Sequence, residues 1–168
     1  ASTYFQGSKE YMKATSFQLE EEKMAVIIQK IEGENYNTFF YPALSGVAQS
    51  HNFYPVSHMK PEEGIAHVAL GMGKTVVEGG RSIRFSPKYP HIMPQFSSID
   101  DILQNAQRFF YALKIRNYPE TLNFWQNSNL EKRDIDEAES EHAIQLLSST
   151  YSPDEHRLRD SGYLPGPK

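Results

Sequence analysis

Cysteine is absent from the 168-residue sequence, and long apolar runs are absent as well. The first absence excludes disulfides, thiolate nucleophiles and cysteine-ligated zinc, and it is compatible with a reducing compartment. No apolar run approaches the roughly 18 residues that a membrane-spanning helix requires. The first residues also lack the apolar core of a secretory signal. We therefore expect a cytoplasmic location and no membrane partner.

An excess of positive charge is also missing. The formal net charge is −4, from 17 basic and 21 acidic residues. Because a protein that binds nucleic acid needs a basic field for the phosphate backbone, this balance argues against a nucleic-acid partner. Any anion site must be built locally from a few cations. With 39% hydrophobic residues, the chain can bury the core of one domain.

Short apolar and β-branched runs separated by Gly and Pro predict an α+β fold, a mostly antiparallel sheet with flanking helices. The strands are expected near residues 24–32, 44–52, 65–70, 81–85 and 143–150. One helix is expected near the N-terminus. Another is expected over residues 99–107, where Ser98 is a suitable N-cap.

Weaker patterns predict further elements. Residues 38–41 can form a short strand and residues 74–78 one helical turn. A strand at 108–115 is possible, because aromatic residues favour a pleated surface. Residues 122–142 are polar or strongly acidic, which predicts an exposed connection with at most a short helix. The tail from about residue 160 is expected to be disordered.

No familiar catalytic motif is complete. Four histidines lack the spacing of zinc motifs and are interpreted as structural: His51, His58, His67 and His91. There is no nucleophile elbow of the Gly-x-Ser-x-Gly type. The glycine-rich stretch at residues 71–75, GMGKT, resembles the end of a phosphate-binding loop but lacks the first glycine at the required spacing. Backbone N–H groups and Lys74 could still face an anion there, or the glycines could simply turn the chain.

Charged residues follow this turn. Glu78 offers one carboxylate to Mg²⁺, and Arg81 and Arg84 offer cations to phosphate oxygens. The alternative, which composition alone favours, is an exposed acid at a helix end and two solvated strand arginines.

Three blocks of sequence occur in order. They are MAVIIQKI at residues 24–31, SGVAQSHN at 45–52 and VALGMGKTVVEG at 68–79. Together they resemble the ATP-grasp nucleotide-binding domain of phosphoenolpyruvate synthases and pyruvate phosphate dikinases. The resemblance implies that residues 1–89 form the core of one ATP-grasp lobe and that residues 90–168 extend the same domain.

The resemblance and the local charge pattern together give the candidate site residues. The nucleotide-binding candidates are Gln29, Ile31, Lys74, Arg81 and Arg84, and the metal candidate is Glu78. Gln29 and Ile31 fall at the edge of the adenine hinge. Ala66 and Lys74 stand where the family has carboxylates, and losing a carboxylate weakens the binding of Mg²⁺.

The function that the resemblance implies is the ATP-binding lobe of a phosphoenolpyruvate synthase-like phosphotransferase, with ATP and Mg²⁺ as cofactors. Its expected partners are an upstream ATP-grasp lobe and a phosphohistidine domain of the parent protein. The alternative is a degenerate, non-catalytic ATP-grasp-like scaffold or regulatory interaction module, because Ala66 and Lys74 replace acidic residues.

Overall fold

The computed structural model describes residues 6–14, 25–56, 58–115, 129–166 and 168. The chain divides into two compact units, Ala1–Ile31 and Glu32–Lys168. The first unit contains α1 (Gln6–Ala14), which confirms the helix expected near the N-terminus. Within α1, Nε2 of Gln6 donates to Oε1 of Glu10 at 3.1 Å, one helical turn away.

The apolar run after this helix is extended but is not a strand. Val26, Ile27 and Ile28 are 82%, 82% and 92% exposed, and residues 25–32 belong to no sheet. The strand predicted at 24–32 is therefore wrong for residues 25–32, and Met24 lies outside the described residues. β-branched residues favour a pleated, half-buried surface, but a strand also needs a neighbouring strand to receive its hydrogen bonds.

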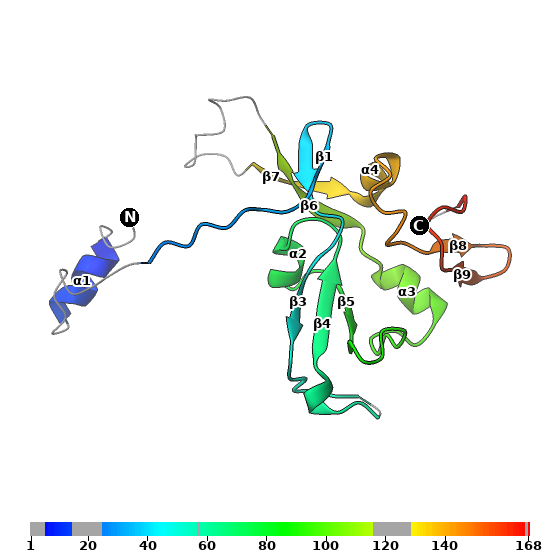
Figure 1. Ribbon diagram of the computed structural model, residues 1–168, viewed down its shortest axis with the longest axis horizontal. Helices are drawn as coiled ribbons and strands as arrows, with labels where there is room; N and C mark the ends of the chain where they lie inside the picture. The colour runs from blue at the N-terminus through cyan, green and yellow to red at the C-terminus, as the bar shows by residue number, and fades with distance from the viewer. Residues whose placement is uncertain (1–5, 15–24, 57, 116–128, 167) are drawn as a thin grey trace. The chain divides into compact units, whose positions relative to one another are not determined.

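The second unit contains three antiparallel sheets, which Figure 1 shows. Their strand orders are β1-β2-β6-β7, β3-β4-β5 and β8-β9. The strands are β1 (Glu34–Tyr36), β2 (Phe39–Tyr41), β3 (Ser45–Gln49), β4 (Ile65–Ala69), β5 (Ile83–Phe85), β6 (Phe109–Lys114), β7 (Leu130–Asp134), β8 (Thr150–Ser152) and β9 (Arg157–Arg159). The helices of this unit are η2 (Pro61–Glu63), α2 (Lys74–Val77), α3 (Ile99–Asn105) and α4 (Ile135–Ser140).

These elements confirm the predicted α+β class with mostly antiparallel strands, although the strands are divided among several sheets. The strands expected at 44–52, 65–70 and 81–85 are β3, β4 and β5. The weaker predictions at 38–41, 74–78 and 108–115 correspond to β2, α2 and β6. α3 begins after Ser98, whose hydroxyl accepts from the backbone N–H of Asp101 at 3.2 Å, so the predicted cap is confirmed.

The strand predicted at residues 143–150 is wrong. The backbone N–H groups of Leu147 and Ser148 both donate to the carbonyl of Ile144 at 2.9 Å, so the chain turns there and only Thr150 enters a strand. Ala143 and Ile144 are nevertheless buried. The apolar pattern correctly indicated burial, but local turn hydrogen bonds satisfy the backbone instead of a ladder.

The tail expected to be disordered is instead packed against β8. The Thr150 hydroxyl donates to the carbonyl of Ser161 at 2.7 Å. Nζ of Lys168 donates to the Thr150 hydroxyl oxygen at 3.0 Å, and the Lys168 side chain is only 7% exposed. A buried threonine therefore holds the segment after residue 160, because its hydroxyl both donates and accepts.

β7 lies within the segment that was predicted to be an exposed connection, and that prediction is wrong for residues 130–134, which form a strand. β7 pairs with β6 in the register Phe110↔Arg133 and Tyr111↔Lys132. Residues 122–128 of the same predicted connection lie outside the described residues. α4, which follows β7, is the short helix that the acidic stretch allowed.

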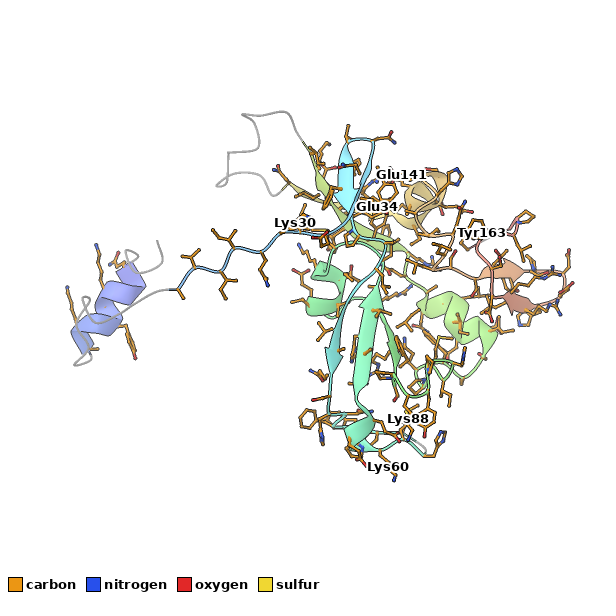
Figure 2. All side chains as sticks on the ribbon, in the orientation of Figure 1. Lys30, Glu34, Lys60, Lys88, Glu141 and Tyr163 are labelled. Carbon is orange, nitrogen blue, oxygen red and sulfur yellow. The ribbon has the colours of Figure 1, made fainter. Side chains whose placement is uncertain are left out.

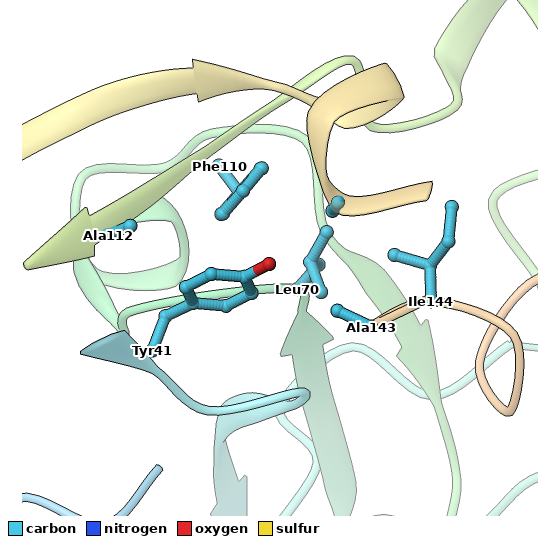
Figure 3. Close-up of a cluster of buried hydrophobic side chains, with 7 residues drawn as sticks. Tyr41, Leu70, Phe110, Ala112, Ala143 and Ile144 are labelled. Carbon is cyan, nitrogen blue, oxygen red and sulfur yellow. The ribbon is translucent and has the colours of Figure 1, made fainter. Parts of the chain in front are cut away.

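The hydrophobic core lies between β2, β6 and α4, as Figure 3 shows. Tyr41 and Phe110 are both 0% exposed, and their rings lie 4.8 Å apart. The buried cluster is Tyr41, Leu70, Phe110, Ala112, Ala138, Ala143 and Ile144. β6 contributes Phe110 and Ala112 to this cluster, and Phe110 is much the larger of the two. Phe110 therefore contributes most of the packing from β6.

A buried guanidinium closes one side of this core. Arg133 of β7 donates to Glu137 of α4 at 2.6 Å and to Glu141 at 2.9 Å. Its guanidinium carbon lies 4.0 Å from the centre of the Phe39 ring. Glu141, which follows α4 (Figure 2), also accepts a hydrogen bond from the Tyr41 hydroxyl. Each charge in this network therefore has a partner, as burial requires.

We predict that Phe110→Ala lowers the free energy of unfolding by roughly 3–5 kcal/mol, because it leaves a cavity beside Tyr41. Urea denaturation measures the change. The matched control is Phe53→Ala, since Phe53 is 73% exposed. Equal losses in the two variants would contradict this placement of the core.

We predict a second effect on stability that depends on pH. Hydrogen bonds from Arg133, and then from the backbone N–H of Asp134, hold the pKa of Glu137 below its ordinary value of 4.5. Since the pKa is lowered by folding, this stabilisation is present above pH 4.5 and is lost as pH falls through the lower folded pKa.

Glu137→Gln should therefore destabilise the protein at neutral pH and should lose that effect as the pH falls through the lowered pKa of Glu137. Urea denaturation across this range measures the difference from the unaltered chain, with Glu62→Gln as the exposed control. A difference that stays constant with pH would show that Glu137 does not stabilise the fold as a charged group.

Candidate functional site

A cavity of about 600 Å³ lies between α2 and the strands β6 and β7. We call it the cationic cleft, and its lining residues are Thr75, Glu78, Gly79, Gly80, Arg81, Gln107, Arg108, Phe109, Tyr111 and Lys132. Three of these side chains are cations and one is a carboxylate. In a chain of net charge −4, this is a local concentration of positive charge. Its volume is in the range of small-molecule sites.

Hydrogen bonds between two segments distant in sequence fix the position of α2. The Gln107 side-chain oxygen accepts from the backbone N–H of Leu70 at 2.9 Å, and its amide nitrogen donates to the Leu70 carbonyl at 3.1 Å. Two residues further along the chain, the N–H of Met72 donates to the carbonyl of Tyr111 at 2.8 Å. The end of β4 is thereby tied to β6, so α2 begins beside the cleft.

Gly71 allows this close approach. Its φ is +80°, a conformation that glycine adopts without the strain of a side chain. A Cβ at this position would lie 2.7 Å from the carbonyl oxygen of Tyr111 and 2.8 Å from Cδ2 of Phe110. The first glycine of the glycine-rich stretch therefore serves packing between the sheets.

β6 supplies the aromatic wall of the cleft. Side chains alternate along a strand, so Phe109 and Tyr111 face the cleft while Phe110 faces the core. Nζ of Lys132 lies 4.2 Å from the centre of the Phe109 ring, and Nζ of Lys74 lies 4.7 Å from the centre of the Tyr111 ring. Each lysine is attracted to the negative face of a ring, which holds its charge at the wall.

Thr75 carries an unpaired polar group at the cleft. The residue is 6% exposed, and its hydroxyl has no hydrogen-bond partner among the described residues. Leaving a buried hydroxyl unpaired costs free energy, so such groups usually have a structural or functional explanation.

The structure brings together three residues that the sequence singled out. Lys74 and Glu78 are one helical turn apart, with 3.6 Å between Nζ and Oε1. Arg81 follows the glycine pair and donates from Nη1 to the carbonyl of Ala106 at 3.2 Å. Glu78 and Arg81 line the cleft, and Lys74 contacts its Tyr111 wall.

Arg84, another predicted site residue, does not join this group. Arg84 lies on β5 opposite His67, and its backbone N–H donates to Oε1 of Gln95 at 2.7 Å. The Arg84 side chain does not line the cationic cleft. Gln29 and Ile31 belong to the first unit, Ala1–Ile31, so their roles at an adenine hinge remain predictions.

Sequence reasoning missed Arg108, Phe109, Tyr111 and Lys132 as site residues. The three consecutive aromatics at residues 109–111 indicated a strand, but they did not indicate which of its faces would line a cavity. Lys132 faces Tyr111 only because β6 and β7 pair in one particular register. That register depends on contacts far apart in sequence, so no local signal could have revealed it.

The residues present do not fit a protein-held Mg²⁺. Within the part of the chain that the structure describes, no group of three or more His, Cys, Asp or Glu side chains could hold a metal ion. Among the described residues that line the cleft, Glu78 is the only carboxylate, and it lies close to the Lys74 ammonium. Mg²⁺ requires oxygen ligands in octahedral geometry, and a lysine next to the ligand opposes its binding.

The fold and the cleft define an α+β domain with a cavity that is lined mainly by cations among its charged residues. A family model described as pyruvate phosphate dikinase, AMP/ATP-binding domain, matches residues 1–144, and the chain belongs to this family. The resemblance to phosphoenolpyruvate synthases and pyruvate phosphate dikinases is thereby confirmed. The chain is thus an AMP/ATP-binding region of a protein of this kind.

Comparisons with curated proteins and with solved structures gave no match. Every helix in the described part of the chain falls short of the length and hydropathy needed to cross a bilayer.

We predict that Thr75→Val raises the free energy of unfolding of the unliganded chain by about 1 kcal/mol, because it removes an unpaired buried hydroxyl while keeping the shape of the side chain. The same change should leave the stabilisation by added ATP unchanged, because the enclosed hydroxyl does not reach the cleft and only a change in affinity would alter that stabilisation. Urea denaturation with and without ATP measures both effects. Thr75→Ser keeps the hydroxyl and is the control, and a loss of stability in Thr75→Val would show that the hydroxyl is paired.

Proposed function

We propose that this chain is the nucleotide-binding lobe of a phosphoenolpyruvate synthase-like phosphotransferase and that the cationic cleft receives the phosphates of ATP. The observation that supports the proposal is the group of Arg81, Arg108 and Lys132 around one cavity. Guanidinium and ammonium groups form strong charge-assisted hydrogen bonds with phosphate oxygens. The family match, to an AMP/ATP-binding domain, indicates that the phosphates belong to a nucleotide.

Each lining group has a role in this proposal. Arg81 uses one N–H for the Ala106 carbonyl, which orients its guanidinium and leaves its other donors for phosphate. Phe109 and Tyr111 exclude water from one wall, which strengthens the attraction between the cations and the phosphates.

The reaction would need parts beyond this lobe. In the proposed parent protein, an upstream ATP-grasp lobe supplies further phosphate-binding cations, and a phosphohistidine domain accepts the phosphoryl group. ATP supplies that group, and the lobe described above binds and orients it. We expect the parent protein to act in the cytoplasm. Any Mg²⁺ that it uses would need ligands besides Glu78.

A specific observation favours a second candidate, a degenerate scaffold or regulatory module. Ala66 and Lys74 occupy positions where the resemblance places carboxylates, and Glu78 is paired with Lys74. A phosphotransfer assay with ATP and pyruvate on the protein that contains this chain separates the two candidates. Turnover excludes the scaffold, whereas nucleotide binding without turnover supports it.

We predict that calorimetric titration detects binding of ATP and that Arg81→Gln weakens it roughly tenfold to a hundredfold, because a charged hydrogen bond to phosphate is lost. Arg159→Gln removes the same charge from β9, outside the cleft, and is the control.

Arg84→Gln tests the role that the sequence suggested for that residue. The cleft predicts a change in affinity within about twofold, as for a surface residue outside the site. Absence of ATP binding to the unaltered chain at millimolar nucleotide would reject autonomous binding by this lobe.

A further inference from the structure

The charges of the cationic cleft are unequal. In the part of the chain that the structure describes, Arg81, Arg108 and Lys132 line it, and Glu78 is the single acidic lining residue. The Glu78 carboxylate lies 3.6 Å from the Lys74 ammonium, so its charge is already balanced. Lys74 lies over the ring of Tyr111, a lining residue. A ligand in the cleft therefore meets a surplus of positive charge.

These positive groups are held at the wall by contacts that leave donors available. The Lys132 ammonium lies over the ring of Phe109. The attraction between a ring and a cation does not require an acceptor atom, so the N–H donors of the ammonium stay available to a ligand. Arg81 donates from Nη1 to a backbone carbonyl, and its guanidinium has further N–H groups. Oriented cations of this kind can bind phosphate oxygens directly, without an intervening metal ion.

The same arrangement disfavours a divalent cation. Mg²⁺ bound to a nucleotide occupies the phosphate oxygens and keeps several waters, and proteins usually steady it with one or two carboxylates. In the cleft, Glu78 is engaged by Lys74, and the other charged lining groups would repel Mg²⁺. Ala66, on β4, offers no carboxylate at the other position that the resemblance indicates.

We propose that the cationic cleft binds its nucleotide as the metal-free anion, with Arg81, Arg108 and Lys132 taking the place of Mg²⁺ at the phosphates. This inference rests on the proposed function, because it assumes that the cleft is the nucleotide site. It adds that Mg²⁺ competes with the protein for the same phosphate oxygens. Free Mg²⁺ would then regulate how much nucleotide the lobe carries.

The test is a calorimetric titration of the whole chain with ATP, once with EDTA and once with Mg²⁺ in excess over ATP. Ionic strength is held equal, because salt screens the cations. We expect ATP to bind roughly tenfold more tightly in EDTA, a difference that corresponds to the loss of about one charged hydrogen bond. AMP is the control ligand, since a single phosphate chelates Mg²⁺ weakly, and its affinity should be nearly the same in both buffers.

Variants connect the effect to the cleft. Lys132→Gln and Arg108→Gln should each weaken metal-free ATP and reduce the advantage of EDTA over Mg²⁺. Lys88→Gln removes a lysine from the far end of the sheet β3-β4-β5, where Figure 2 shows it, and should change neither value. Unfolding curves for each variant establish that the fold is intact.

A further variant should make the binding of ATP depend on Mg²⁺. Lys74→Glu removes the cation beside Glu78 and adds a second carboxylate one helical turn away, which should shift the preference towards Mg²⁺-bound ATP. Unaltered chain that binds ATP more tightly with Mg²⁺ than with EDTA would overturn the inference and leave the proposed function intact. Absence of binding in both buffers would reject the two together.

Discussion

The contact on which the second unit most depends is the pairing of the buried Arg133 guanidinium with two carboxylates. Its hydrogen bonds to Glu137 and Glu141 join a strand of the largest sheet to the helix after it. Tyr41 adds the neighbouring strand β2 through its hydroxyl. Burial, and then the hydrogen bond to Glu141, raise the pKa of that hydroxyl, so it remains a donor over the whole working range of pH. Removing one partner would leave a buried charge alone, which costs more than the pair contributes.

This core determines where the cleft can form. Phe110 packs under the guanidinium and against Tyr41, and this fixes both the position and the face of β6. The alternate residues of that strand are then directed to the opposite side. The N–H of Met72 donates to the carbonyl of Tyr111 in the strand, and the N–H of Leu70 donates to the side chain of Gln107, two residues before the strand. These bonds place the start of α2 against this second side. The cleft is therefore a consequence of how two sheets are joined at one strand.

The sequence predicted the parts of this arrangement that depend on neighbours in the chain. Lys74, Glu78 and Arg81 could be grouped because one helical turn and a glycine pair separate them. Residues 25–32 were misjudged because their pattern reports a preference for burial, whereas a strand also needs a partner strand. The polar sequence of β7 gave no sign of its role, since Arg133 can be buried only where Glu137 and Glu141 meet it. The strand register that places Lys132 is likewise a property of the folded chain.

The alternation along β6 has a consequence for how this domain can change over evolutionary time. Positions 110 and 112 are fully buried in the core, so most replacements there would cost stability. Positions 109 and 111 contact the cavity and are partly exposed, so they can be exchanged with little effect on folding. One strand thus separates, residue by residue, the requirements of folding from those of ligand choice. A lineage could acquire a preference for a different phosphorylated ligand through single substitutions at the outer positions while the architecture stayed the same.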